Sequence, residues 1–378
     1  MTHREAREGK HMHGTVRRIA LLVETALTGL PRMLDPRTGI FTFTVRPSGP
    51  AGRSLRYTSI TLIGLTAAAR AGFETRLDLD RLVRGLAERR REMTNPGELG
   101  LLLWCLSDYH EEITPAHDEI VAHLPTTPAR LGGMSSTELG WLLSGLARTA
   151  MVAPARDDVA DKAHAVYEAL RRNYTQSSGL FCFGGRGATG VRRRLRRQLG
   201  FFDNQVYGIQ SAVDYHRAFH DPASLAMAER CVDTILRAQG PLGQWAWHYL
   251  VRTGAVVDRY PVYSVHQHGM GPMALQALAE VTGHSHDEAL ERSVAWVFGE
   301  NELRCPMIDP DAGVIWRSIR RRTARGKLIH VFKLLSLVGL QGVGDRLGGV
   351  VNVPGQLEID AECRSYELGW LLAAFVRR

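Results

Sequence analysis

Three copies of one phrase occur in the chain: Glu98-Leu-Gly-Leu-Leu-Leu103, Glu138-Leu-Gly-Trp-Leu-Leu143 and Glu367-Leu-Gly-Trp-Leu-Leu372. Each copy is mostly apolar or small on every side, which is typical of a helix that is surrounded by protein. The glycine lets a neighbouring backbone approach closely, although it costs about 1 kcal/mol of helix propensity. Three looser copies occur at 57–65, 203–210 and 264–273. The repeat therefore predicts six inner helices.

Amphipathic segments lie between these copies and predict a second, outer layer of helices. Their charged stripes keep one face in water. The clearest examples are 79–92, 157–173, 223–238 and 286–298. An inner helix that alternates with an outer one six times predicts an all-α (α/α)6 toroid. We expect one domain over residues 1–378, with residues 1–18 as a flexible N-terminal arm.

A second phrase recurs on the connections between helices. A turn glycine is followed by alternating aromatic or β-branched residues, as in Gly39-Ile-Phe-Thr-Phe43. Similar stretches begin at Gly179, Gly243 and Gly313. This pattern predicts short strands or hairpins. We expect them at one rim of the toroid, just before the next inner helix.

Composition excludes several classes of protein. The chain has 378 residues, 44% of them hydrophobic and 23% charged, with a net charge of +8, which is the balance of a folded globular protein rather than a disordered one. Its apolar runs are far shorter than the roughly 20 residues that span a bilayer. Five scattered cysteines without CxxC pairs and an N-terminus without an apolar segment indicate a reduced, cytoplasmic protein. No Walker loop, GxSxG or HExxH motif occurs, so we expect neither cofactor nor metal.

The alternation of inner and outer helices resembles the α/α toroid proteins. These include six-hairpin glycosidases, sugar epimerases of the N-acylglucosamine 2-epimerase type, and terpenoid cyclases with protein prenyltransferases. The stretch from Gln239 through Gly243 to Trp245 is similar to the QxxxGxW phrase of terpenoid cyclases, where it stabilises the join between helices. The Glu367 phrase is similar to an inner-helix phrase of the epimerases. Where that family has a histidine three residues before the Glu, this sequence has Arg364.

Polar residues at the starts of inner helices are the candidates for chemistry, because those ends open onto a central funnel. We predict catalytic roles for Glu138, Asp203, His266 and Glu367. A pair of carboxyl groups could act as acid and base on a glycosidic bond, and a histidine could move protons near neutral pH. The alternative is that Glu98, Glu138 and Glu367 cap their helices, since three copies of one feature favour a structural role.

Substrate binding is predicted for residues close to these positions. The set is Trp245, His248, Gln205, Gln267, His268 and Arg317. Aromatic rings at the mouth of a funnel stack on sugars or line an apolar pocket, and an arginine supplies a cation to an acidic ligand. His266 and His268 are two residues apart, so on a helix they would diverge and could not easily share a metal.

Two basic runs, 192–197 and 320–327, precede inner helices and predict attraction of an anionic substrate. Contact with an anionic membrane surface and plain solvated loops are the other interpretations. No aromatic-interleaved basic stripe accompanies the runs, so we expect no nucleic-acid partner.

The sequence favours an enzyme that acts on a sugar, an oligosaccharide or a lipid-linked saccharide by carboxylate or histidine acid–base chemistry, as a hydrolase or an epimerase. Two alternatives stay open. One is an isoprenoid-handling protein like the terpenoid cyclases and prenyltransferases. The other is a non-catalytic binding protein of a polysaccharide pathway.

Overall fold

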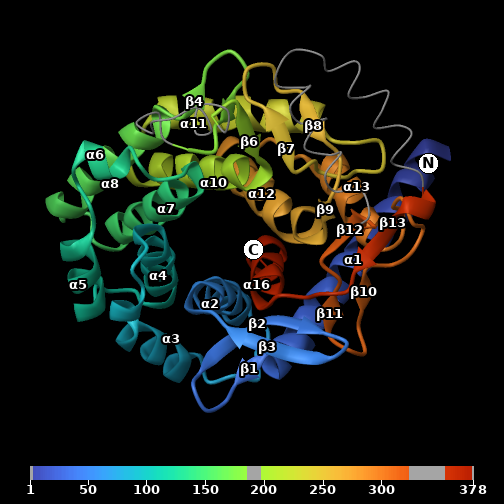
Figure 1. Cartoon of the computed structure of the whole chain (residues 1–378), viewed down its shortest axis with the longest axis horizontal. Helices are drawn as coiled ribbons and strands as arrows, with labels where there is room; N and C mark the ends of the chain where they lie inside the picture. Colours follow the sequence, from blue (N-terminus) through green and yellow to red (C-terminus); the bar gives the residue numbers. More distant parts are fainter. Residues whose placement is uncertain (1–2, 185–196, 323–353, 377–378) are drawn as a thin grey trace.

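The inner ring of the fold surrounds one axis (Figure 1). The computed structural model describes residues 3–184, 197–322 and 354–376, and all six copies of the repeat lie on inner helices within these residues. The helices are α2 (Leu55–Arg70), α4 (Pro96–Tyr109), α7 (Ser136–Val152), α10 (Phe202–Phe219), α12 (Gly271–Thr282) after a π-helical turn at His266–Met270, and α16 (Ser365–Phe375). The predicted inner layer is confirmed.

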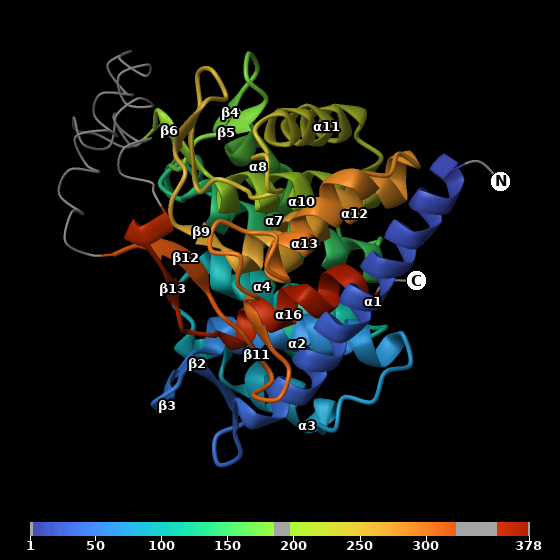
Figure 2. The ribbon, with the colours of Figure 1, turned by 90° about the vertical axis from the view of Figure 1, so that its right-hand side faces the viewer.

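The outer helices cover this ring. They are α1 (His3–Arg32), α3 (Leu79–Glu88), α5 (Pro115–His123), α8 (Asp157–Arg171), α11 (Pro222–Arg237) and α13 (Asp287–Val297). All four segments that the charge pattern singles out are among them, so the predicted toroid is confirmed. Residues 3–18, for which the sequence predicts an arm, form the first part of α1. This helix runs along the outside of the ring beside α13 and α16 (Figure 2), and Thr15 Oγ1 donates a hydrogen bond of 2.8 Å to Glu291.

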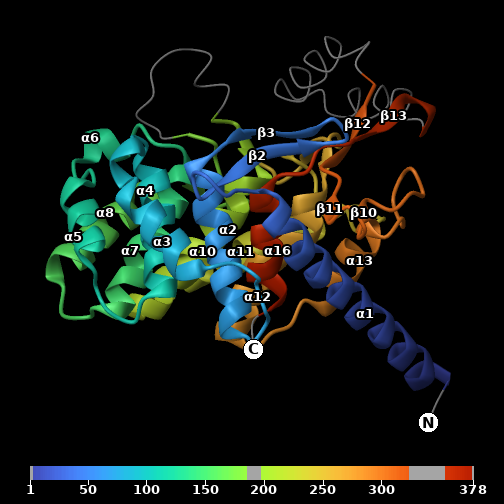
Figure 3. The ribbon, with the colours of Figure 1, turned by 90° about the horizontal axis from the view of Figure 1, so that it is seen from below.

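Short strands gather at the end of the ring where the inner helices begin (Figure 3). They form five small antiparallel sheets within the described residues: β1 (Leu34–Asp35), β2 (Ile40–Arg46) and β3 (Gly49–Arg53); β4 (Tyr174–Thr175) and β5 (Leu180–Phe181); β6 (Leu199–Phe201), β7 (His248–Leu250) and β8 (Val256–Asp258); β9 (Val262–Tyr263), β12 (Ser318–Arg321) and β13 (Leu357–Asp360); and β10 (Ile308–Asp309) with β11 (Val314–Ile315). Three of the four predicted turn glycines lead directly into a strand. The stretch after Gly243 forms no strand before His248.

Glycines set the distance between neighbouring inner helices. A methyl group added at Gly64 of α2 would lie 2.1 Å from the carbonyl oxygen of Gly369 on α16. One added at Gly100 of α4 would lie 2.4 Å from the Cα of Leu142 on α7. No side chain fits at such separations, so these helices touch backbone to backbone. This explains why the repeat keeps a glycine at a position where glycine weakens the helix itself.

The QxxxGxW phrase joins the outer helices α11 and α13. The Gln239 side-chain amide donates to the Gly243 carbonyl at 2.9 Å and to the Ala289 carbonyl at 3.0 Å. The indole of Trp245 donates to Ser293 Oγ at 2.9 Å. The phrase therefore stabilises the join between successive hairpins, as the resemblance implies.

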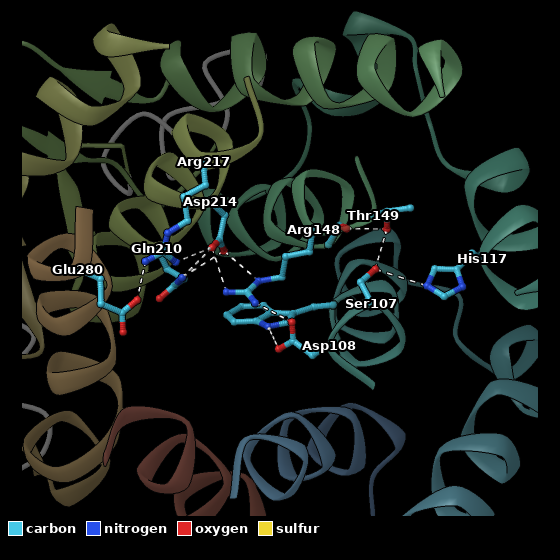
Figure 4. A network of polar contacts seen from close by, with 11 residues as sticks. Ser107, Asp108, His117, Arg148, Thr149, Gln210, Asp214, Arg217 and Glu280 are labelled. Atoms are coloured by element: carbon cyan, nitrogen blue, oxygen red, sulfur yellow. Dashed lines mark hydrogen bonds and ion pairs between the residues drawn. The ribbon is translucent and has the colours of Figure 1, made fainter. Parts of the chain in front are cut away.

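The opposite end of the ring is held by ion pairs among four inner helices (Figure 4). Arg148 of α7 donates to Asp108 of α4 at 2.7 Å and to Asp214 of α10 at 2.9 Å. Arg217 of α10 lies 3.7 Å from Asp214 and donates to Glu280 of α12 at 2.5 Å. Asp214 is fully buried, so its charge depends on these two arginines.

Replacement of Gly369 by alanine tests the close contact between α2 and α16. Because the new methyl group would lie 2.7 Å from the Cα of Thr61, we expect Gly369→Ala to lower the free energy of unfolding by about 3 kcal/mol, as overpacking does. Urea denaturation measures this change. The matched control is Gly85→Ala in α3, where nothing lies within 4 Å. That variant should be stabilised by about 0.5–1 kcal/mol, and a loss of stability in both variants would contradict the interpretation.

Arg148→Met tests the ion pairs at the far end. This substitution leaves Asp214 buried with one partner fewer, and we expect a loss of about 3 kcal/mol in the free energy of unfolding. The control is Arg84→Met, which removes the partner of Asp80 from a pair whose side chains are 67% and 58% exposed. Such a pair contributes less than about 1 kcal/mol. Equal effects in the two variants would argue against a supporting role for Arg148.

Candidate active site

A cavity of about 150 Å³ opens at the end of the ring where the inner helices begin. Its walls combine aromatic rings, two arginines and one carboxyl group. The residues that line it are Arg56, Tyr57, Ile60, Trp141, Asp203, Tyr207, Trp247, Tyr263, Val265, His266, Met270, Arg317 and Tyr366. Three of the predicted site residues, Asp203, His266 and Arg317, meet in this cavity.

Asp203 supplies the carboxyl group among these lining residues. It lies in the first turn of α10, where its Oδ1 accepts a hydrogen bond from the Asn204 amide at 2.8 Å. Its Oδ2 accepts one from Thr137 Oγ1 on α7 at 3.0 Å. Burial raises the pKa of Asp203 to about 6 and outweighs these two hydrogen bonds, which lower it. The group can therefore give or accept a proton near neutral pH.

Arg317 places a cation over the cavity. Its guanidinium lies 5.1 Å above the ring of Tyr263 and faces three carboxylates, at 3.6 Å for Glu362, 3.7 Å for Glu367 and 4.0 Å for Asp360. These separations are longer than hydrogen bonds, so the three carboxyl groups form ion pairs with Arg317 without direct hydrogen bonds. Arg56, by contrast, donates from Nε to Glu98 at 2.8 Å.

Glu138 and Glu367 lie outside the set of cavity-lining residues and cap their own helices. The carboxylate of Glu138 accepts from the amide and from the hydroxyl of Ser135, both at 2.8 Å. Glu367 accepts from the Arg364 amide at 3.3 Å and is fully buried. Burial raises the pKa of Glu367 to about 8. The arrangement favours the capping alternative for both residues.

His266 lies on the π-helical turn and is packed between aromatic rings. Its ring is 5.2 Å from that of Trp247, at an interplanar angle of 17°, and 4.6 Å from that of Phe202. Burial, assisted by the charge of Arg317, lowers its pKa to about 3. The imidazole is therefore neutral at pH 7. Its catalytic role stays a prediction, and at pH 7 the imidazole is in the form that accepts a proton.

The remaining predicted histidines lie away from the cavity. His268 is fully buried, and burial lowers its pKa to about 3. His248 is buried in β7, with its ring 4.9 Å from that of Phe201. Among the residues that the structure describes, no group of three or more His, Cys, Asp or Glu side chains could hold a metal ion.

Three further predicted ligand contacts have structural partners instead. Gln205 bonds both the amide and the carbonyl of Phe181, at 2.8 and 2.9 Å. Gln267 donates to the Tyr263 carbonyl at 3.2 Å. Trp245 is fully buried against Phe202. The two glutamine side chains are occupied by backbone hydrogen bonds and the tryptophan is buried, so none of the three side chains lines the cavity.

Several residues that line the cavity are not among the site residues predicted from the sequence, namely Arg56, Tyr57, Trp141, Tyr207, Trp247, Tyr263 and Tyr366. The Trp-Ala-Trp stretch points to aromatic residues at this rim, but only the structure shows that Trp247, the more exposed of the two tryptophans, reaches the cavity. Tyr366 directly precedes Glu367, and only the direction of the first turn of α16 decides which of these two side chains reaches the cavity.

The two basic runs are only partly described. Residues 192–196 and 323–327 lie outside the described residues. Arg320 and Arg321 on β12 lie 3.1 Å from Glu358 and 2.9 Å from Asp258, respectively. Contact of the basic runs with a membrane surface stays a prediction. No helix within the described ranges is long and apolar enough to cross a bilayer.

Comparison with known proteins supports the fold. No protein-family profile matches the sequence, and no curated protein matches it. Solved structures do match. An unsaturated glucuronyl hydrolase specific for heparin gives a TM-score of 0.64 at 13% identity, over 96% of this chain and 95% of that chain. A sugar epimerase from a ruminal bacterium gives 0.59 at 10% identity, over 95% and 98%.

An alpha-1,6-mannanase of Salegentibacter sp. HEL1_6, as an inactive variant in complex with alpha-1,6-mannotriose, gives a TM-score of 0.58 at 12% identity, over 94% of this chain and 98% of that chain. The chain therefore has the (α/α)6 toroid fold that these carbohydrate-active enzymes share. At such low identity, the likeness extends to the fold alone.

Glu367→Gln tests the protonation state of the buried carboxyl group. A carboxyl whose pKa is raised in the folded state stabilises the fold below the pKa of the unfolded chain, and this stabilisation is lost as pH rises toward the folded value of about 8. Between pH 6.5 and 8 we expect the free energy of unfolding of the unmodified protein to fall relative to that of the variant, by up to about 1.4 kcal/mol per pH unit. Urea denaturation across this range measures the difference.

Glu288→Gln, which replaces an exposed carboxyl group, is the control. Its free energy of unfolding should change with pH as that of the unmodified protein does. A Glu367→Gln variant that also follows the unmodified protein across this range would show that Arg317 keeps Glu367 ionised in the fold.

Proposed function

We propose that the protein is an enzyme that binds the terminal sugar of an acidic saccharide in the cavity and exchanges a proton with it through Asp203. The observation that carries the proposal is the position of this carboxyl group, whose pKa is raised to about 6 by burial, in a cavity walled by aromatic rings. Aromatic faces stack on the apolar faces of sugar rings. The enzymes that share the fold support a saccharide as the ligand.

Two arginines in the wall of the cavity support an acidic sugar. Arg56 and Arg317 both line it; Arg56 is paired with Glu98, and Arg317 lies 3.6–4.0 Å from three carboxyl groups. A guanidinium fits a carboxylate in a planar, bidentate arrangement. We therefore propose a uronate-type carboxylate as the partner of Arg317. One of the proteins that share the fold is, by its name, a glucuronyl hydrolase.

The number of carboxyl groups supports a particular type of chemistry. Glycosidases that use two carboxyl groups hold them about 5–9.5 Å apart on either side of the scissile bond. Among the described residues that line this cavity, Asp203 is the one carboxyl group. This favours a reaction in which a single group adds or removes the proton, with the neutral His266 and the nearby phenols positioning the sugar.

Turnover of acidic and neutral substrates tests the proposal. We expect disaccharides with an unsaturated or saturated glucuronic acid at the non-reducing end to be turned over, and the matching glucosides to be turned over far more slowly. Asp203→Asn should lower kcat by about 10²–10⁴-fold with little change in KM, because it removes the proton and leaves the cavity walls intact. The pH profile of kcat/KM should show a limb near 6, the pKa of Asp203.

Glu288→Gln, which changes an exposed carboxyl on α13, is the matched control and should keep full activity. Retention of kcat in Asp203→Asn would remove Asp203 from the mechanism. Tight binding of the acidic disaccharides without any turnover would instead indicate a non-catalytic binding protein, the alternative that the sequence leaves open.

A further inference from the structure

We propose that Phe43 forms a second sugar-binding subsite outside the cavity, so that the ligand is a chain of at least two sugar units. This inference rests on the proposed function, because it concerns the same saccharide. It assigns the second sugar to the face of one ring on strand β2, at the rim of the toroid.

The cavity is small beside a ligand of two or more sugar units. Its volume is about 150 Å³, and it is open to the surface at the rim. A second sugar unit must therefore rest on the surface next to the opening. The residues at that rim decide whether the second unit contributes to binding.

Phe43 stands at the rim in contact with the wall of the cavity. Its side chain is 38% exposed, and its ring is stacked on that of Tyr57 with centroids 5.0 Å apart and an interplanar angle of 12°. Tyr57 lines the cavity, and its ring is 4.4 Å from that of Tyr366, which also lines it. Three aromatic rings thus form a continuous row from the surface into the cavity, and Phe43 is its outer end.

Neighbouring contacts hold this ring in place. The guanidinium of Arg364 lies 4.7 Å from the centroid of Phe43 and donates to the hydroxyl of Tyr57 at 2.8 Å. Val45, two residues along the strand, exchanges backbone hydrogen bonds of 2.7 and 2.8 Å with Cys363. Strand β2 is therefore tied to the segment that leads into α16. A ring that is already held in position loses little conformational freedom when a sugar stacks on it.

A half-exposed cation lies further along the same strand. Arg46 has a side chain that is 47% exposed and pairs with Glu362, which is almost fully buried.

Binding of one-unit and two-unit ligands tests the inference. The probes are glucuronic acid and a disaccharide of glucuronic acid linked to glucose, titrated calorimetrically into the Asp203→Asn protein so that no turnover occurs. We expect the disaccharide to bind about 3- to 10-fold more tightly than the monosaccharide, the range that one aromatic contact provides. Phe43→Ala, introduced into the Asp203→Asn protein, should abolish this difference in affinity and leave the affinity for the monosaccharide unchanged. Phe43→Trp should preserve the difference in affinity between the two ligands.

Phe73→Ala is the matched control, because Phe73 is 43% exposed but follows the C-terminal end of α2, away from the cavity. It should bind both probes as the parent protein does. If Phe43→Ala fails to fold, Phe43→Leu keeps an apolar side chain at the site and removes only the flat face.

Two results would overturn the inference in distinguishable ways. Equal affinities for the two probes, or an equal effect of Phe43→Ala on both, would remove the second subsite and leave the proposed function standing. Failure of both probes to bind at all would remove the proposed function and the subsite with it.

Discussion

Backbone contact between neighbouring inner helices is the constraint on which the rest of the structure depends. Gly64 against Gly369 and Gly100 against Leu142 bring helix axes together where no side chain fits. Gly100 and Gly369 lie in the second turns of α4 and α16, whereas Gly64 lies in the second half of α2. With the inner helices held this close, side chains from α2, α7, α10 and α16 surround a cavity of about 150 Å³.

The two ends of the toroid use charge differently. The N-terminal ends of helices carry partial positive charge and favour anions, and the C-terminal ends favour cations. At the far end, Arg148 and Arg217 lie near helix C-termini and are paired with carboxylates of neighbouring inner helices. These ion pairs hold the inner helices together at that end. At the cavity end, Arg317 meets its carboxylates only at 3.6–4.0 Å. That looser arrangement leaves a cation next to a cavity, which suits binding of an acidic ligand.

Burial decides the protonation state of the groups near the cavity. It raises the pKa of Asp203 to about 6 although a helix N-terminus and two hydrogen bonds favour the ionised form. It lowers the pKa of His266 to about 3, so that the histidine is a neutral hydrogen-bonding and stacking group at pH 7. The same effect therefore makes the carboxyl, rather than the imidazole, the group that titrates near neutral pH. The row of rings from Phe43 to Tyr366 then links this centre to the outer surface.

The sequence by itself determined the inner and outer layers, the strand-forming connections after Gly39, Gly179 and Gly313, and the helix starts near which a cavity would open. These features follow from local periodicity, turn residues and a glycine repeated at equivalent positions, and all of them can be seen along one chain. It also singled out Asp203, His266 and Arg317. Only the tertiary structure decided that Trp247 rather than Trp245 lines the cavity, that Gln205 and Gln267 are occupied by backbone groups, and that Glu138 and Glu367 cap their helices. Those outcomes depend on the direction of each side chain and on partners from segments distant in sequence, which no pattern of residues records.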